Sequence, residues 1–196
     1  MKIYPRFSKE AVHALTRGGV GIVPTDTIYG ISGLALRKRT VEKIYRLRKR
    51  NPKKPMIVLI GSLADLKKFG VRLRHSEHAL LTRLWPGKVS VVLPCRGRKF
   101  AYLHRGRRTL AFRMPAWKPL AAFLKITGPL VSTSVNPEGK PPATSIREAR
   151  KYYGNRVAFY IDKGRLASAP STLVALARGR VAILRQGAAR IRGTKQ

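Results

Sequence analysis

Short apolar runs alternate with amphipathic segments along most of this chain. The runs that have the length of buried strands lie at residues 20–23, 56–60, 89–93, 109–112, 130–132, 157–161, 172–177 and 181–184. Segments with helical spacing or helix-capping signals begin near Ser8, Thr40, Ser62, Ser76, Trp117 and Ser145. Strands and helices are interleaved early, whereas strands cluster late. The pattern therefore predicts an α/β fold: a twisted, open sheet of mixed parallel and antiparallel strands, with helices that flank it.

Local signals set the expected helix boundaries. Ser8 is the expected N-cap of the first helix, and Thr40 is the expected N-cap of the second. The second helix must end by Asn51, because a residue before proline avoids the helical region. Ser62 and Asp65 have the spacing of a capping box.

The stretch 19–33, GVGIVPTDTIYGISG, joins an apolar strand to a hydroxyl-rich loop. The loop carries Thr25, Asp26 and Thr27, and the two glycines after it allow positive φ or close approach of a ligand. An open α/β sheet places its ligand at strand ends of this kind. An ordinary strand-to-helix turn is the alternative interpretation, and this stretch alone does not decide between them.

Polar clusters recur where predicted strands or helices end. Their members are Thr25, Thr27 and Tyr29; Arg48, Arg50 and Lys54; Ser132, Ser134 and Asn136; and Ser171, Thr172 and Arg185. Favourable placement at a helix C-terminus and solvation explain one or two of these cations, whereas the stiff segment 52–55 suits positioned phosphate-binding groups. Arg113 ends an apolar strand, so its charge needs a partner or solvent at the sheet edge.

The charge is strongly one-sided, with 42 Lys and Arg against 8 Asp and Glu and a net charge of +34. Such a field attracts polyanions, either nucleoside triphosphates or RNA, although a solvated basic surface is an alternative explanation. The 196 residues fit a single domain, 1–196, and no apolar run has the length of a membrane span. No secretory signal is evident at the N-terminus, so we expect a cytoplasmic protein without membrane contact.

Several chemistries find no support in the sequence. Cys95 is the only cysteine, which excludes internal disulfides and multi-thiolate metal sites. The four histidines lack the spacing of a zinc site, and we expect no metal held by protein ligands. No P-loop or Rossmann glycine motif is present, so any bound ATP uses another kind of site.

With these clusters assembled, the sequence resembles the YrdC/TsaC family of L-threonylcarbamoyl-AMP synthases from about Gly18 to Gly187. The motifs that carry the resemblance are PTDTIYG at 24–30, RKR at 48–50 followed by PMIVLI, WPGKVS at 85–90, TLAFRMP at 109–115, STSVN at 132–136, PSTLVAL at 170–176 and ILRQG at 183–187. Each motif is weak alone, but their order and spacing together are specific.

The resemblance implies a basic concave groove and a nucleotidyltransferase reaction. L-threonine, bicarbonate and ATP, the last with magnesium, would give threonylcarbamoyl-AMP and pyrophosphate. The product would feed threonylcarbamoyladenosine modification of tRNA, through a separate threonylcarbamoyl-transferase complex. The basic surface also admits direct tRNA contact.

The resemblance also implies roles for individual residues. Thr27, Arg113, Ser132 and Ser171 fall on the family's L-threonine site. Arg50, Lys54, Thr109, Ser134, the backbone near Pro142, and Arg185 fall on its ATP site. Arg48, Arg50, Ser134 and Asn136 form what resembles the family's catalytic tetrad. Four positions depart from the family pattern: Arg48 replaces a usual lysine, Asn51 and Lys88 each replace a proline, and Leu59 replaces a histidine of some relatives.

Two other functions remain open at this level. A non-catalytic YrdC-like paralogue that binds RNA would also be strongly basic. The intact segment 134–136 and the loop threonines favour the enzyme, because an RNA-binding module has no need of an amino-acid pocket. A carbamoyl-transferring domain of a hydrogenase-maturation protein is less favoured, since the sequence shows no zinc-finger cysteines.

Overall fold

The computed structural model describes residues 2–177 and 180–191. Its strands are β1 (Lys2–Tyr4), β2 (Gly21–Val23), β3 (Gly30–Leu34), β4 (Ile57–Leu59), β5 (Val89–Pro94), β6 (Thr109–Arg113), β7 (Leu130–Ser134), β8 (Phe159–Ile161), β9 (Thr172–Ala177) and β10 (Arg180–Arg185). The α-helices are α1 (Lys9–Thr16), α2 (Lys38–Arg48), α3 (His75–Leu84), α4 (Ala101–His104), α5 (Lys118–Thr127) and α6 (Ile146–Tyr153). Three 3₁₀ segments, η1 (Leu63–Phe69), η2 (Arg98–Phe100) and η3 (Gly154–Arg156), complete the elements.

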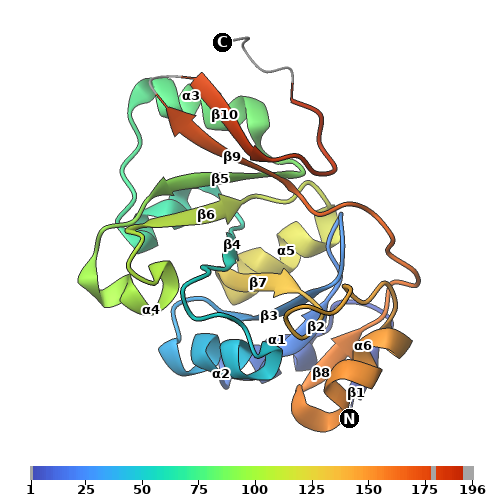
Figure 1. Cartoon of the computed structure of the whole chain (residues 1–196). Helices are drawn as coiled ribbons and strands as arrows, with labels where there is room; N and C mark the ends of the chain where they lie inside the picture. Colours follow the sequence, from blue (N-terminus) through green and yellow to red (C-terminus); the bar gives the residue numbers. More distant parts are fainter. Residues whose placement is uncertain (1, 178–179, 192–196) are drawn as a thin grey trace.

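The ten strands form one sheet in the order β1-β8-β2-β3-β7-β4-β6-β5-β9-β10 (Figure 1). The pairs β1–β8, β2–β8, β4–β6 and β5–β9 are parallel, and the other pairs are antiparallel. The predicted mixed sheet with flanking helices is therefore confirmed.

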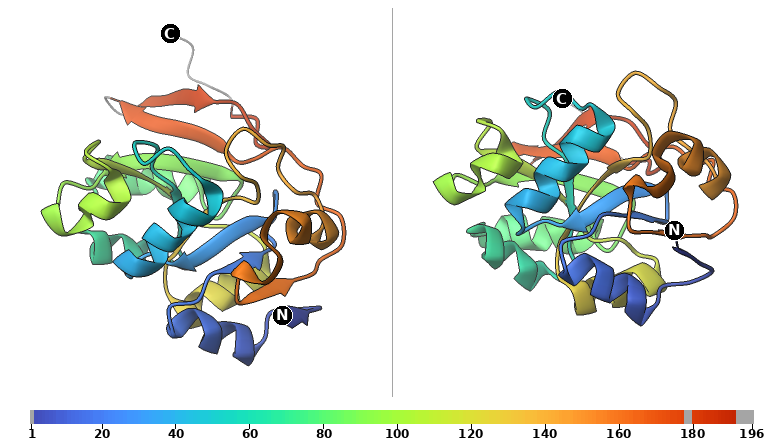
Figure 2. Two further views of the ribbon diagram at one scale, coloured as in Figure 1. Left: turned by 60° about the horizontal axis from the view of Figure 1, so that its bottom comes forward. Right: turned by 90° about the horizontal axis from the view of Figure 1, so that it is seen from below.

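Helices cover both faces of the sheet. Figure 2 shows α1 and α5 packed side by side on one face, with α2 and α6 on the other. The smaller hydrophobic cluster lies under α1 and α5 and includes Leu15, Phe123 and Leu124. The larger one includes Ile44 of α2, Phe112 of β6 and Tyr153 of α6. Both clusters include residues of the central strands, so they hold these strands in place against the helices.

The central register brings distant segments together. Gly30 of β3 pairs with Ser134 of β7, and Ile57 of β4 pairs with Ser132. Leu59 of β4 pairs with Arg113 of β6. The predicted hydroxyls of β7 and the predicted Arg113 of β6 therefore lie on the two strands that flank β4.

Two capping predictions hold. The Ser8 hydroxyl accepts a hydrogen bond from Ala11 N at 3.2 Å at the start of α1. The Asp65 carboxylate accepts from Ser62 N at 3.2 Å, although the segment that follows is the 3₁₀ helix η1.

The prediction of Thr40 as a helix N-cap is wrong. The helix α2 begins two residues earlier, after Arg37, and the Thr40 hydroxyl donates to Gly18 O at 3.1 Å. That tertiary contact decides the role of Thr40, and it is invisible to a local capping pattern.

The loop after β2 leads into a second strand, β3, so the alternative interpretation of an ordinary strand-to-helix turn is wrong. Gly30 and Gly33 belong to β3, and neither has positive φ. A Cβ at Gly30 would lie 2.3 Å from Ser132 Oγ, and one at Gly33 would lie 2.4 Å from Thr40 Cγ2. These glycines let neighbouring side chains pack against the strand. They also interrupt the run of apolar residues by which β3 could have been predicted.

Candidate functional site

A cavity of about 790 Å³ lies against one face of the central strands, where alternate residues of β4 (Ile57, Leu59) and β6 (Thr109, Ala111, Arg113) line it. Among its lining residues are the predicted Thr27, Arg50, Thr109, Arg113, Ser132, Ser134, Pro142, Ser171 and Arg185. They come from segments between the β2–β3 loop and β10. Residues that are remote along the chain thus surround one space, as the sequence predicts.

The lining is basic. Its arginines are Arg50, Arg107, Arg113 and Arg185, and none of the described residues that line it is acidic. This agrees with the predicted basic groove. An anionic ligand would meet cations without competing carboxylates inside the cavity.

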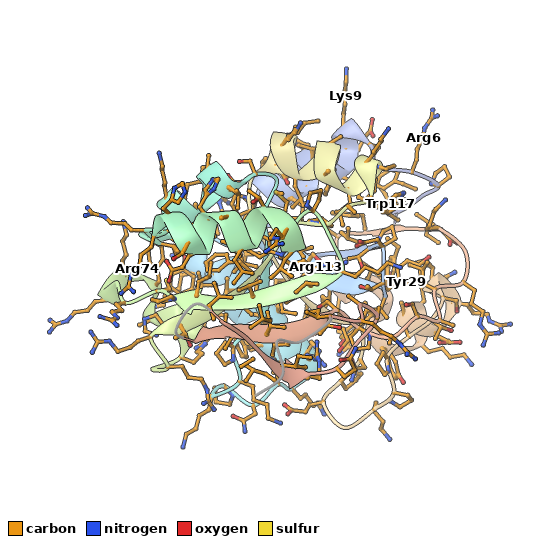
Figure 3. The ribbon with its side chains drawn as sticks, turned by 90° about the horizontal axis from the view of Figure 1, so that it is seen from above. Arg6, Lys9, Tyr29, Arg74, Arg113 and Trp117 are labelled. Carbon is orange, nitrogen blue, oxygen red and sulfur yellow. The ribbon has the colours of Figure 1, made fainter. Side chains whose placement is uncertain are left out.

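Arg113 defines one end of the cavity. Its side chain is only 4% exposed, and Nη2 donates to Asp26 Oδ1 at 2.5 Å. Nη1 donates to Thr27 Oγ1 at 3.0 Å, and Nε donates to Gly87 O at 3.0 Å. Burial lowers the pKa of Arg113, and the Asp26 carboxylate opposes that shift. Of the two expected possibilities for the Arg113 charge, a partner or solvent, the structure has a partner, and it is Asp26. In Figure 3 Arg113 lies within the outline of the ribbon, whereas Arg6 and Lys9 extend away from it.

Buried hydroxyl pairs complete this end, which we call the Arg113 end. Ser132 Oγ accepts from Ser32 Oγ at 2.9 Å, and Ser171 Oγ lies 2.8 Å from Ser90 Oγ. Thr25 Oγ1 accepts from the backbone N–H groups of Thr27 and Ile28, both at 3.1 Å, and so stiffens the loop. Because these hydroxyls are already fixed by protein partners, they present oriented polar groups to a ligand.

The other cations of the lining are Arg50, Arg107 and Arg185, a group that we call the Arg50 end. Arg50 Nε donates to Lys54 O and Nη2 donates to Pro55 O, both at 3.0 Å. Arg107 Nε donates to Lys53 O at 3.4 Å, and Arg185 Nη2 donates to Ser171 O at 2.8 Å. Among the ion pairs of the described residues, none involves these three arginines. Their charges are oriented by carbonyl oxygens and remain available to an anion.

Arg48 and Asn136 do not line the cavity. Arg48 is 3% exposed and lies beneath the wall that β7 forms. Its Nη1 donates to Thr133 Oγ1 at 2.7 Å, and its Nη2 donates to Asn136 Oδ1 at 3.0 Å and to Ser134 Oγ at 3.4 Å. Burial lowers the pKa of Arg48, and the nearby charge of Arg50 lowers it further. Arg48 fastens the segment 133–136 to α2.

Lys54 also lies outside the lining. Its side chain is 56% exposed, and Nζ pairs with Glu138 Oε1 at 2.6 Å. Glu138 also accepts from Asn51 N, so it ties the loop after α2 to the loop after β7. Hydrogen bonds from Lys54 and from Asn51 N lower the pKa of Glu138.

A strap, residues 164–171, crosses the cavity between β8 and β9. Leu166, Ala167, Ser168, Pro170 and Ser171 of the strap contribute to the lining. Tyr29, which lines the cavity below, donates to Gly164 O at 2.7 Å. Burial raises the pKa of Tyr29 to about 12, so the hydroxyl keeps its proton at neutral pH. The strap therefore forms part of the cavity wall.

The described residues offer no group of three or more His, Cys, Asp or Glu side chains that would hold a metal ion. The cavity lining supplies hydroxyls and cations instead of carboxylates. Within the same part of the chain, no helix is long and apolar enough to cross a membrane.

Two residues of this region were not predicted as site residues. Asp26 carries a partial signal, since it is one of few acids and stands in the polar loop after an apolar strand. Arg107 carries none, because it is one of 42 basic residues and only the fold brings it to the lining.

Comparisons with known proteins show the family to which the chain belongs. The chain is 34% identical over 178 residues to a threonylcarbamoyl-AMP synthase of Thiobacillus denitrificans. This match covers 89% of this chain and 94% of that protein. It resembles the crystal structure of P. abyssi Sua5 complexed with L-threonine, with a TM-score of 0.83 and 26% identity. The match covers 95% of this chain but only 58% of that one.

The structure of E. coli YciO has the same fold, with a TM-score of 0.83 at 22% identity, over 98% of this chain and 97% of that one. A family model described as "Telomere recombination", named for Sua5, YciO and YrdC, matches residues 13–187. The chain therefore belongs to the Sua5/YciO/YrdC family.

Proposed function

We propose that this protein is an L-threonylcarbamoyl-AMP synthase, which converts L-threonine, bicarbonate and ATP into threonylcarbamoyl-AMP and pyrophosphate. The proposal rests mainly on one observation. A single cavity is lined by the buried guanidinium of Arg113 among hydroxyls and by three further arginines that form no ion pair among the described residues. Relatives that match nearly the whole chain bear the same activity in their names. We also interpret residues 1–196 as one domain, because strands from both ends of the described chain join one sheet.

The Arg113 end suits an amino acid. Arg113 would form a charge-assisted hydrogen bond with the carboxylate of L-threonine. The hydroxyls of Thr27, Ser132 and Ser171 would hold its polar atoms. Leu59, buried in the lining, would supply apolar contact to the methyl group.

Carbamate formation needs a dry cavity. The nitrogen of L-threonine attacks the carbon of bicarbonate, water leaves, and an N-carboxylate (carbamate) forms. Carbamates revert readily in water, so the strap over the cavity would protect this intermediate. No covalent bond to the protein is needed.

The Arg50 end suits the phosphates of ATP. A carbamate oxygen attacks the α-phosphorus, a P–O bond forms, and pyrophosphate leaves, which makes the reaction a nucleotidyl transfer. Arg50, Arg107 and Arg185 would offset the charge that builds on the phosphates, together with magnesium bound to the nucleotide. Catalysis then consists of positioning and electrostatics.

We assign different roles to the remaining predicted residues. Arg48 and Asn136 would keep Ser134 in place from beneath the wall. Lys54 would act at the rim, where its ammonium lies beside Glu138. Thr109 and the backbone near Pro142 would contact the nucleoside. We further propose that the product passes to a separate threonylcarbamoyl-transferase complex, with tRNA contact through the basic surface.

The test is isothermal titration with L-threonine and with ATP, followed by pyrophosphate release with and without bicarbonate. We expect binding of both substrates and pyrophosphate release that depends on both L-threonine and bicarbonate. Binding of RNA without binding of L-threonine would instead support the non-catalytic paralogue. Steep salt dependence of RNA affinity would not separate the two, because both carry the same charge.

A further inference from the structure

Asp26 contacts Arg113 from outside the large cavity. The two side chains are 10% and 4% exposed, and one hydrogen bond of 2.5 Å joins them. Asp26 is not part of the lining of the large cavity. It lines a smaller cavity of about 290 Å³ together with Trp117 and Lys163, and the two cavities share Thr25, Thr27 and residues 166–168 as lining. The carboxylate thus contacts Arg113 from the adjoining smaller cavity.

The donors of Arg113 can be counted. A guanidinium has five N–H donors in a rigid plane. Gly87 O, Thr27 Oγ1 and Asp26 Oδ1 each accept one. The two that remain are one on Nη1 and one on Nη2, so each of these atoms keeps a donor for a further acceptor. The three protein acceptors fix the orientation of the guanidinium plane.

The pair has a cost that the fold does not explain. Asp26 Oδ2 is buried and has no hydrogen-bond partner among the described residues. A buried carboxylate oxygen without a donor is unfavourable, and a buried ion pair seldom stabilises more than apolar residues of the same size. A role in orienting Arg113 accounts for keeping the carboxylate.

We propose that Asp26 is a positioning residue for amino-acid binding, which holds the guanidinium plane of Arg113 so that its two unused N–H groups meet the carboxylate of L-threonine. This inference rests on the proposed function. Before the substrate arrives, Asp26 neutralises the buried cation and keeps it ordered, so that less order must be imposed on binding. Its action passes through Arg113 and does not extend to the nucleotide.

The test is a pair of substitutions, Asp26→Asn and Asp26→Ala, with calorimetric titration of L-threonine and ATP on the same samples. Asp26→Asn keeps the shape and one acceptor oxygen but loses the charge, so we expect L-threonine affinity to fall about tenfold. Asp26→Ala removes the acceptor as well, and the loss should be larger. ATP affinity should stay within about twofold of wild type in both variants. Retained ATP binding reports that the fold is intact, and Asp26→Asn carries the test if Asp26→Ala does not fold.

The matched control is Asp65→Asn. Asp65 is also a buried carboxylate with a cationic partner, Lys68 at 2.8 Å, but it lies in η1 and does not line the cavity. Its loss should lower stability and leave L-threonine affinity unchanged. The proposal is overturned if Asp26→Asn binds L-threonine as wild type does, or if L-threonine and ATP affinity fall equally. Absence of L-threonine binding by the wild type would contradict the proposed function instead, so the two failures are distinguishable.

Discussion

The two ends of the cavity differ in the burial of their arginines and in the partners of those arginines. At the Arg113 end the guanidinium is buried, paired with Asp26, and surrounded by hydroxyls that already have protein partners. At the Arg50 end, Arg185 and Arg107 are exposed and hydrogen-bond to backbone carbonyls alone. We therefore expect single changes at the Arg113 end to have large effects, and changes at the Arg50 end to be offset in part by the other charges there.

The largest effect is expected for Arg113→Ala. Truncating a buried, hydrogen-bonded charge costs about 3 kcal/mol, so L-threonine affinity should fall by about 100-fold. ATP affinity, measured by titration of the same sample, should change little. Arg113→Lys keeps the charge but lacks the planar guanidinium, so its L-threonine affinity should lie between those of wild type and Arg113→Ala. Normal L-threonine binding by Arg113→Ala would mean that the amino acid binds elsewhere.

The second-largest effect is expected for substitutions of Arg48, which lies beneath the cavity wall formed by β7. Arg48→Met removes the donors that hold Thr133, Ser134 and Asn136, and we expect the free energy of unfolding to fall by about 2–3 kcal/mol. Urea denaturation measures this loss. Arg48→Lys retains the charge and part of the bonding, so the loss should be about 1 kcal/mol. Unchanged stability of Arg48→Met would show that segment 133–136 is held by other contacts.

A smaller effect is expected at the Arg50 end. Arg107→Ala should raise the dissociation constant of ATP about fivefold, because the other arginines compensate in part. Arg108→Ala is the control: it removes the same charge one residue away, from an exposed side chain that does not line the cavity. Equal effects of the two variants on ATP affinity would mean that only the overall field matters.

The smallest effect is expected at the rim and depends on pH. The pKa of Glu138 is lower in the folded protein than in the unfolded chain, chiefly because Lys54 and Asn51 N donate to it. Its contribution is therefore present above the unfolded pKa and is lost as pH falls through the folded pKa. Glu138→Gln should lower the melting temperature slightly at pH 7. The difference from wild type should shrink at about pH 3, and a constant difference at both pH values would contradict the assignment.

Local patterns predicted most of the architecture. Apolar runs marked eight of the ten strands, and cap residues such as Ser8 marked helix starts. Two strands were not predicted: β1 because it is short and largely exposed, and β3 because it is rich in glycine. Thr40 was assigned wrongly for a related reason: its hydroxyl serves a tertiary contact with Gly18 O instead of a cap.

The site was predictable as a set of residue types and not as an arrangement. The sequence by itself determined which hydroxyls and cations stand at strand ends, because apolar runs and their boundaries are local. Only the tertiary structure decided that Arg113 and Arg50 face the cavity while Arg48 lies beneath it. That outcome depends on the strand order β3-β7-β4-β6, which joins segments far apart in the chain. The pairing of Asp26 with Arg113, 87 residues away, follows from the same non-local packing.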